Sequence, residues 1–321
     1  MNTRQLRHFL AVMDLGSLSA AANSVHLSLP ALSRSLQALE DELRVPLFDR
    51  QDRRLRPTAY ALEYVQRARS IVFDEKEGAR SLALMRAGEH GPLSFGMGSS
   101  IALNLLGPML LRLLADAPGL YVTTLVQSTD VLAAALRREE LDFFVGDVRV
   151  AAHDRDLIAE PLYPCTFGWF ARKRHPLAGR ARVTVEHLAE YPLIMSGYAD
   201  DAVMRRMAEL YGFTLPLQQH FAASTNDVAT VHTLITASDA IAPSTDIAVI
   251  SAVRAGTVVQ LDVAPALDLE LTLGIVERGG RTRVPAAERA FALVRAFFAS
   301  AAQEVAVHLP PRKTVRRAKA R

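Results

Sequence analysis

The chain has 321 residues, half of them hydrophobic and 22% charged, which excludes a disordered chain and supplies enough apolar side chains for a core. Its single cysteine, Cys165, cannot form an internal disulfide, so a disulfide-stapled secreted module is excluded and a reducing compartment is indicated. Single hydrophobic cores stop growing at roughly 250 to 300 residues, so we expect two or three domains.

No signal peptide or membrane span is predicted. Asp14 cuts short the apolar run near the N-terminus, and polar residues and a proline interrupt the richest later segment, 101–114. We therefore expect a cytoplasmic protein that contacts no membrane.

The net charge of +3 depends on the last ten residues, which hold six basic side chains and no acidic one. A tail of this kind is typical of a solvated, disordered end, and contact with nucleic acid is the alternative. We assign 303–321 to a basic, disordered tail, so the overall charge is weak support for DNA binding.

The first sixty residues predict short helices. Apolar residues recur at helical spacing from Leu6 onward, and Gly16 and Ser17 end this helix and cap the next. Ser28 is a candidate N-cap of a further helix, with Pro30 in its first turn and leucines along one face. Two short helices joined by a tight turn, the second with a small polar exposed face, indicate a helix-turn-helix.

Residues 49–57 are too charged and too short for a core helix, and they predict a basic hairpin, or wing. Arginines lie at 50, 53, 54 and 56, in reach of DNA phosphates if this segment follows a helix-turn-helix. An ordinary solvated turn is the alternative, and Arg50 is also in a position to pair with Asp49 or Glu40 and fix the wing.

A long helix is predicted from Ala59 to about Met85, with apolar residues near heptad spacing, although Glu75 falls on the seam. Such a helix most often packs against a second copy of itself, and burial against its own chain is the alternative. We expect dimerisation through three residues of this helix, Val65, Val72 and Leu82.

Beyond residue 90, short β runs alternate with helical patterns, which is typical of an α/β domain with parallel strands. We expect strands at 93–97, 121–126, 143–145, 166–171, 193–195, 219–222, 240–242, 258–261 and 271–275. A final helix is expected from 286 to about 302.

Catalytic motifs find no support. Gly96 and Gly98 follow a predicted strand, but Ile101 stands where a dinucleotide-binding loop needs its third glycine. The histidines lack the spacing of a zinc site, and no nucleophile-elbow motif occurs. We expect no catalytic residues, no cofactor and no metal.

Hydroxyl and amide residues recur where a strand gives way to a helix. The carboxyl ends of parallel strands form a ligand-binding crevice, and helix N-termini there carry free N–H groups that favour a small carboxylate. Four acidic residues in the same region, Asp147, Asp200, Asp201 and Asp227, would equally suit an amine or merely face water. Plain helix capping is the alternative for each hydroxyl or amide residue. The candidate effector-binding residues are Ser99, Ser100, Ser128, Asp147, Ser196, Thr225 and Asn226.

Three N-terminal motifs carry a family resemblance: residues 16–22, Pro30-Ala31-Leu32-Ser33-Arg34, and 46–50. They strongly resemble the DNA-binding domain of LysR-type transcriptional regulators, and segments 141–143, 175–178 and 188–194 are similar to that family's effector domain. The sequence departs from the family at Leu29, where glutamine is common, and at Arg44 and Ala61, where glycine is common. Ser238-Asp239 also replaces a glycine-containing turn.

The resemblance implies an α/β protein with an N-terminal winged helix-turn-helix (1–58), a linker helix and hinge (59–90) and a two-lobed effector domain (91–302) similar to periplasmic binding proteins. Lobe I would hold 91–162 and 268–302, and lobe II 163–267, with the chain crossing near 161–164 and 265–268. DNA contacts are expected from Ser17, Ser28, Pro30, Ala31, Ser33, Arg34, Gln37, Arg50, Arg53 and Arg54.

The function implied is a ligand-responsive, bacterial-type transcriptional regulator, not an enzyme. It would bind an interrupted palindromic operator as a homodimer or dimer of dimers. If the protein is an activator, RNA polymerase would be a further partner. A secreted solute-binding protein shares the two-lobed fold but would need a signal peptide and lack the first ninety residues. A metabolic enzyme is the third alternative, and it would need a set of catalytic residues that we do not find in the sequence.

Overall fold

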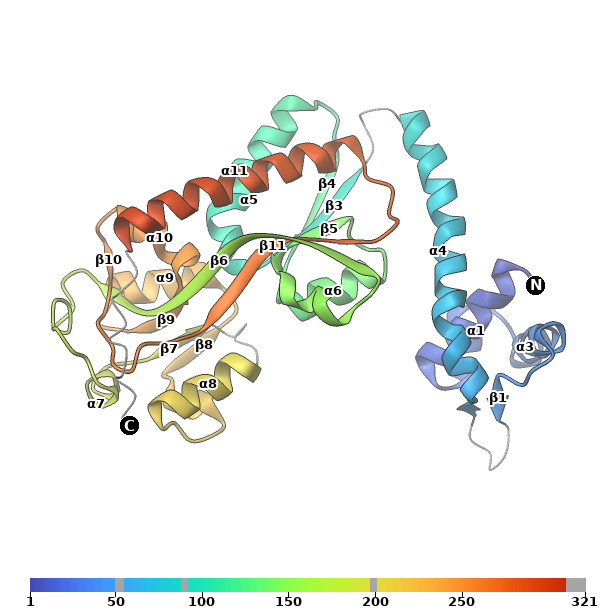
Figure 1. Ribbon diagram of the computed structural model, residues 1–321, viewed down its shortest axis with the longest axis horizontal. Coiled ribbons are helices and arrows are strands. Elements are labelled where there is room, and N and C mark those ends of the chain that lie inside the picture. Colours follow the sequence, from blue (N-terminus) through green and yellow to red (C-terminus); the bar gives the residue numbers. More distant parts are fainter. Residues whose placement is uncertain (50–54, 88–91, 197–200, 310–321) are drawn as a thin grey trace, which may run out of the picture. The chain divides into compact units, whose positions relative to one another are not determined.

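A computed structural model describes residues 1–49, 55–87, 92–196 and 201–309 (Figure 1). The chain forms two compact units, Met1–Gly88 and Glu89–Arg321. The first unit is helical except for a short hairpin, and the second is a mixed α/β unit.

The first unit is a winged helix-turn-helix followed by a long helix. Its elements are α1 (Thr3–Leu15), α2 (Leu18–Ser24), α3 (Leu29–Leu43), β1 (Phe48–Asp49), β2 (Arg56–Pro57) and α4 (Ala59–Ala87). Phe9, Leu32 and Leu39 are fully buried in one core, which the first half of α4 completes with Ala68 and Val72. The predicted helix-turn-helix and long helix are confirmed, and the long helix also belongs to the core of its own unit.

Local chemistry sets the ends of these helices. Gly16 adopts a left-handed backbone (φ 63°) at the end of α1, and its N–H donates to Val12 O at 2.9 Å. Ser17 then caps α2 by accepting from Ala20 N. The turn between α2 and α3 passes through His26, which is also left-handed (φ 55°).

The second unit has nine helices or 3₁₀ turns and nine strands in its described part. They are β3 (Leu93–Met97), α5 (Ser99–Asp116), β4 (Val122–Val126), α6 (Thr129–Arg137), β5 (Phe143–Asp147), η3 (Val148–His153), β6 (Leu157–Arg172), α7 (Val185–Ala189), β7 (Ile194–Ser196), α8 (Asp201–Tyr211), η4 (Leu217–His220), β8 (Ala223–Thr225), α9 (Val228–Ala237), β9 (Ala242–Thr245), α10 (Asp246–Arg254), β10 (Val258–Gln260), β11 (Glu270–Arg278) and α11 (Pro285–His308).

A seven-stranded sheet runs through the unit in the order β10-β6-β11-β5-β3-β4, and β9 also pairs with β6. Strands β4, β3 and β5 are parallel, whereas β11 is antiparallel to β5 and β6. Strands β7 and β8 form a separate parallel pair. The sheet therefore has parallel pairing at one end and antiparallel pairing at the other.

Strand β6 joins the two halves. Residues 157–166 pair with β11, and 167–172 pair with β9 and β10 (Figure 1). The strand thus changes partners between Thr166 and Phe167, a few residues beyond the crossing expected at 161–164. Pro161 and Pro164 lie within the strand, where they pair with β11 on one side, and an edge is where a strand tolerates proline.

The pairing between β6 and β11 shifts its register between Leu273 and Gly274, opposite residues 161–163 of β6. A Cβ at Gly274 would lie 2.0 Å from Glu160 O, so the two backbones approach closely only because this residue is glycine.

The prediction of a strand at 219–222 is wrong. The 3₁₀ turn η4 occupies 217–220, and β8 begins three residues later at Ala223.

Helix α11 extends along the sheet and ends at His308, beyond the end predicted at 302. Phe291 and Phe298 pack on Phe143 and Tyr163, with ring centroids 4.8 and 5.6 Å apart. Of the described helices, α11 alone is long and apolar enough to cross a membrane by length and composition, a test that core helices of soluble proteins also pass.

Candidate nucleic-acid interface and effector site

The recognition helix α3 presents the predicted DNA-contacting residues in its first half. Ser28 is the N-cap but makes no capping hydrogen bond, so its hydroxyl is not committed to the helix. Arg34 is exposed, and no hydrogen bond or ion pair joins it to another described residue. Ala31 and Ser33 are half-buried and Pro30 is exposed. Ser17 differs, because its hydroxyl caps α2.

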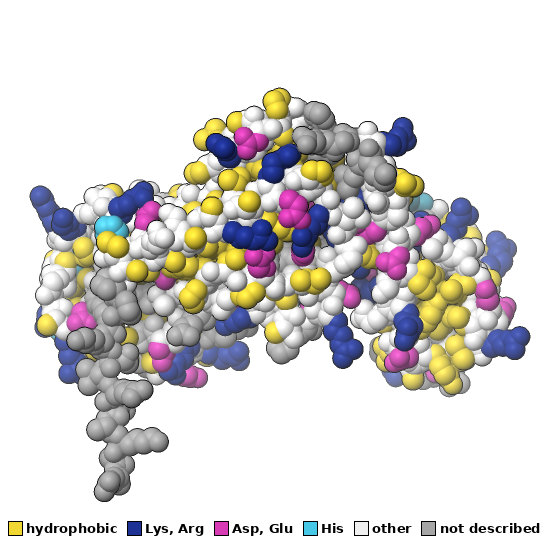
Figure 2. Space-filling view, turned by 45° about the horizontal axis from the view of Figure 1, so that its top comes forward, with side chains coloured by type: hydrophobic (Ala, Val, Ile, Leu, Met, Phe, Trp, Pro, Cys, Tyr) yellow, Lys and Arg dark blue, Asp and Glu magenta, His cyan; other side chains and the backbone are white. Residues whose placement is uncertain are grey.

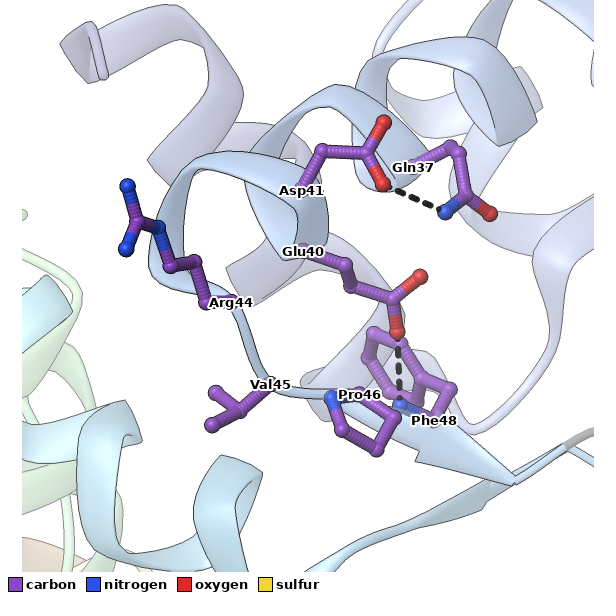
Figure 3. Close-up of a pocket in the computed structure, with 7 residues that line it drawn as sticks. All are labelled: Gln37, Glu40, Asp41, Arg44, Val45, Pro46 and Phe48. Atoms are coloured by element: carbon purple, nitrogen blue, oxygen red, sulfur yellow. Dashed lines mark hydrogen bonds between the residues drawn. The ribbon is translucent and has the colours of Figure 1, made fainter.

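Gln37 lies further along the same exposed face. Its Nε2 donates to Asp41 Oδ1 at 2.9 Å, an i,i+4 pair that orients the side-chain amide (Figure 3). With this orientation Oε1 remains an acceptor toward solvent.

The wing begins directly after α3. Glu40 is 8% exposed, and its Oε1 accepts from Leu47 N at 2.7 Å and from Phe48 N at 3.0 Å. On the other side, Thr58 Oγ1 donates to Pro46 O at 2.7 Å. Strands β1 and β2 confirm the predicted hairpin. Arg50, Arg53 and Arg54 lie outside the described residues, and Arg56 is exposed on β2.

Arg44 ends α3 in a left-handed conformation (φ 57°, ψ 29°). This backbone is strained for a side chain with a Cβ and free of strain for glycine. We expect Arg44→Gly to raise the free energy of unfolding by about 0.5 to 1 kcal/mol in urea titrations. Arg56→Gly, at an extended position, should instead lower the free energy of unfolding. If the two changes have equal effects, backbone strain at Arg44 is negligible.

The three residues expected to dimerise occupy different surroundings in α4. Val72 is 7% exposed and packs into the core of its own unit, and Val65 packs partly against the same core. Leu82 is 64% exposed. Ion pairs Arg69–Asp14 and Arg7–Glu75 tie α4 to α1, which explains why Glu75 interrupts the apolar seam.

Three candidate effector residues lie at one edge of the sheet in the first lobe. Ser99 and Ser100 begin α5 after β3, and Ser128 precedes α6 after β4. Because β3 and β4 are parallel neighbours, with Met97 paired to Val126, these residues share an edge. Their hydroxyls make no hydrogen bond to any other residue that the structure describes.

Asp147 ends β5, which is parallel to β3, and so belongs to the first edge, whereas Ser196, Thr225 and Asn226 lie at a second edge. Strands β7 and β8 are parallel, and Ser196 and Thr225 are paired in register at their carboxyl ends. Thr225 Oγ1 accepts from Asp227 N at 3.1 Å, and Asn226 is exposed. The sequence reasoning therefore grouped residues that the fold collects at two edges, one in each lobe.

Helices α5 and α10 contact each other through hydrogen bonds of Asn104. Asn104, one turn beyond Ser100, donates through Nδ2 to Ile247 O at 2.9 Å and accepts through Oδ1 from Ser251 Oγ at 2.7 Å. Helix α5 starts at the carboxyl end of β3, and α10 starts at that of β9. Their contact therefore joins the helix that follows β3 to the helix that follows β9.

The acidic candidates are committed to other groups. Asp147 accepts from Arg149 N at 3.0 Å and forms an ion pair with the Arg149 guanidinium. Asp227 caps α9, and the hydrogen bond from Thr230 lowers the pKa of its carboxyl, with desolvation opposing that shift. These contacts weaken the alternative in which either carboxylate holds an amine.

Sequence reasoning missed Asn104 and Asp246 as structural determinants, and it named Glu40 only as an alternative partner of Arg50. Asp246 is 3% exposed and accepts from Cys165 Sγ at 3.0 Å and from Thr166 N at 3.0 Å, at the point where β6 changes partners. Burial, followed by the nearby Asp246 carboxylate, raises the pKa of the Cys165 thiol well above its usual value. An acidic residue inside an otherwise apolar pattern was the only signal for Glu40 and Asp246.

Charge over the second unit is mixed. On the face in Figure 2, basic and acidic side chains are interspersed, in keeping with ion pairs such as Arg295–Glu160 at 2.7 Å and Arg254–Glu304 at 2.9 Å. That face of the unit therefore lacks the single-sign patch that phosphate binding requires.

The sequence matches two protein families: "Bacterial regulatory helix-turn-helix protein, lysR family" over residues 3–62 and "LysR substrate binding domain" over 86–299. The "SDS degradation transcriptional activation protein" of a Pseudomonas strain is 32% identical over 288 residues, 89% of this chain and 92% of that protein. The regulator GbpR of Rhizobium radiobacter is 28% identical over 251 residues, 74% of this chain and 79% of GbpR.

The fold is similar to that of full-length OxyR from Pseudomonas aeruginosa, with a TM-score of 0.51 and 23% identity over 92% of this chain and 100% of that one. The expected fold class, a winged helix-turn-helix with an α/β effector domain, is confirmed. Proteins of this family are transcriptional regulators and not enzymes. The chain belongs to the LysR family of transcriptional regulators.

Proposed function

We propose that the protein binds an interrupted palindromic operator through α3 and the wing, as a homodimer or a dimer of dimers, in the cytoplasm. The observation that carries this proposal is the exposed polar face of α3, where Arg34 has no partner among the described residues. Two-fold symmetry in the protein calls for two half-sites separated by about one helical turn or a multiple of it.

Arg34 is proposed to read a base edge. A guanidinium satisfies the O6 and N7 acceptors of guanine together, and Arg34 is exposed and uncommitted. We expect Arg34→Ala to cost about 1 to 3 kcal/mol in binding to the selected operator and to relax preference at one base pair. Fluorescence anisotropy with single-base operator variants measures both effects.

The matched control is Arg56→Ala, which removes an exposed arginine of the wing. It should weaken operator and random DNA by the same factor, since phosphate contacts carry no sequence information. If Arg34→Ala behaves like Arg56→Ala on both DNAs, Arg34 is a backbone contact and the proposed base reading is wrong.

A small effector is proposed to bind at the boundary between the lobes, taking lobe I as 91–162 and 268–302 and lobe II as 163–267. Hydroxyls of Ser99, Ser100 and Ser128 from one edge, and Ser196, Thr225 and Asn226 from the other, would contact it. The N-termini of α5, α6 and α9 meet these edges and favour an anion, so a small carboxylate is the proposed class. Asp147 would contribute through its partner Arg149.

Ser128→Ala tests this site with little disturbance of the fold, because the Ser128 hydroxyl makes no capping bond. In thermal-shift assays, small carboxylates should raise the melting temperature of the native protein, and Ser128→Ala should reduce that rise while leaving the unliganded melting temperature unchanged. Stabilisation by amines and not by carboxylates would contradict the proposed class.

The relative named for activation of SDS degradation supports a role as an activator. RNA polymerase would then be a partner of the bound protein. Dimerisation is proposed to involve α4, with Leu82 as the exposed member of the predicted set and Val65 and Val72 as supporting residues in the core.

A further inference from the structure

The base of the wing is attached to the recognition helix by one buried carboxylate. Glu40 lies on the inward face of α3, and one of its oxygens accepts from two successive backbone groups, Leu47 N and Phe48 N. Hydrogen bonds to an ionised acceptor are about twice as strong as neutral ones, and a buried N–H without a partner is costly. This carboxylate therefore fixes where β1 starts relative to α3.

The hairpin itself supplies little to hold that position. Strands β1 and β2 pair at only two positions, Phe48 with Pro57 and Asp49 with Arg56, and isolated short hairpins are marginally stable. Thr58 N donates to Leu47 O at 2.9 Å from the side of α4. The wing base is thus held by Glu40 from one helix and by Thr58 from the other.

Packing holds the strand only on its inner side. Leu47 and Phe48 are buried in the core of the first unit. On the outer side, an open pocket of about 540 Å³ lies between the end of α3 and the start of the wing, and none of the side chains that the structure describes fills it (Figure 3). Its lining consists of Gln37, Glu40, Asp41, Arg44, Val45, Pro46 and Phe48.

We propose that Glu40 is a positioning residue that sets the wing relative to α3, so that phosphate contacts by the wing and base contacts by α3 form together. The inference rests on the proposed DNA-binding function. Arg56 lies on β2, which pairs with β1, so a change in the direction of β1 would shift Arg56 relative to the bases that α3 is proposed to read. In the sequence, the arginines at 50, 53 and 54 stand between these two strands.

The test is a double-mutant cycle on DNA binding by the full-length protein. The probes are a duplex selected from random sequence by the native protein and an unselected random duplex. In the native background, Arg53→Ala with Arg54→Ala should flatten the slope of log affinity against log salt by roughly 0.9 per lost phosphate contact. In the Glu40→Met background, which removes the acceptor at similar size, the same two changes should leave the slope nearly unchanged.

Glu42→Met is the matched control, because it removes one negative charge from the exposed face of the same helix, and the arginine changes should keep their full effect there. Glu40→Asp is the second variant, should Glu40→Met fail to fold: it keeps the carboxylate but shortens its reach, and should reduce the effect of the arginine changes. Circular dichroism confirms the fold of each variant.

The results distinguish the positioning role of Glu40 from phosphate binding by the wing. If the arginine changes flatten the slope equally in the native, Glu40→Met and Glu40→Asp backgrounds, Glu40 does not position the wing, although the wing binds phosphate. If they leave the slope unchanged in the native background, the wing does not contact phosphate, and the positioning role falls with it.

Discussion

Val72→Asp should unfold the first unit, at a cost on the order of 3 to 5 kcal/mol, because it places an uncompensated charge in a core that already excludes water. Val72 is 7% exposed and packs in one cluster with Phe9, Leu32 and Ala68 of the same chain. Urea unfolding followed by circular dichroism should show the loss, and DNA binding should disappear with the fold.

Leu82→Asp tests dimerisation, the second role expected of α4, separately from the stability of the unit. Leu82 is 64% exposed, so the change should leave the unfolding free energy within about 0.5 kcal/mol of the native value while shifting the protein from dimer to monomer in sedimentation. A Leu82→Asp protein that stays dimeric would place the interface elsewhere. A Val72→Asp protein of native stability would contradict the packing of α4 on its own unit.

Asp246→Ala is expected to be the most damaging single change in the second unit. The carboxylate accepts from the Thr166 hydroxyl at 2.9 Å as well as from Thr166 N, Cys165 Sγ and Ile247 N, and it joins α10 to β6 where that strand changes partners. Removing it leaves buried N–H groups without an acceptor, at a cost of about 3 kcal/mol. The cooperative thermal transition of the unit should fall by several degrees.

Asp246→Asn is the graded comparison, since it keeps one oxygen and the side-chain volume and should lose less stability than Asp246→Ala. Asp227→Ala removes an exposed helix-capping carboxylate and should lose less still. If Asp246→Ala and Asp227→Ala lower the melting temperature equally, the buried hydrogen bonds of Asp246 add nothing beyond ordinary capping.

The helical first unit could be predicted because its signals are local. Ser17 caps a helix, Pro30 lies in a first turn, and the leucines of α3 lie on one face, and each of these needs only neighbouring residues. The family resemblance rested on the same short motifs. The strands of the first lobe were also found, because alternating buried runs and polar helix starts are visible in a single sequence.

Errors arose where a distant partner decides the local structure. The strand predicted at 166–171 begins at Leu157 in the structure and continues through Pro161 and Pro164, because β11 pairs with residues 157–166 and approaches closely at Gly274. The run 219–222 alternates like a strand, yet His220 Nε2 accepts from Thr214 N at 3.1 Å, and such local bonds hold η4 instead. Glu304 in the predicted tail pairs with Arg254, which extends α11.

Selection of random-sequence duplexes by the full-length protein, followed by footprinting of the enriched sequence, tests the central claim most directly. We expect the selection to enrich one motif with two-fold symmetry, and the footprint to show two protected half-sites about one helical turn or a multiple of it apart. With Arg34→Ala, we expect the preference at one base pair of each half-site to be lost. Enrichment of no motif, with equal affinity for all duplexes, would contradict sequence-specific recognition by α3.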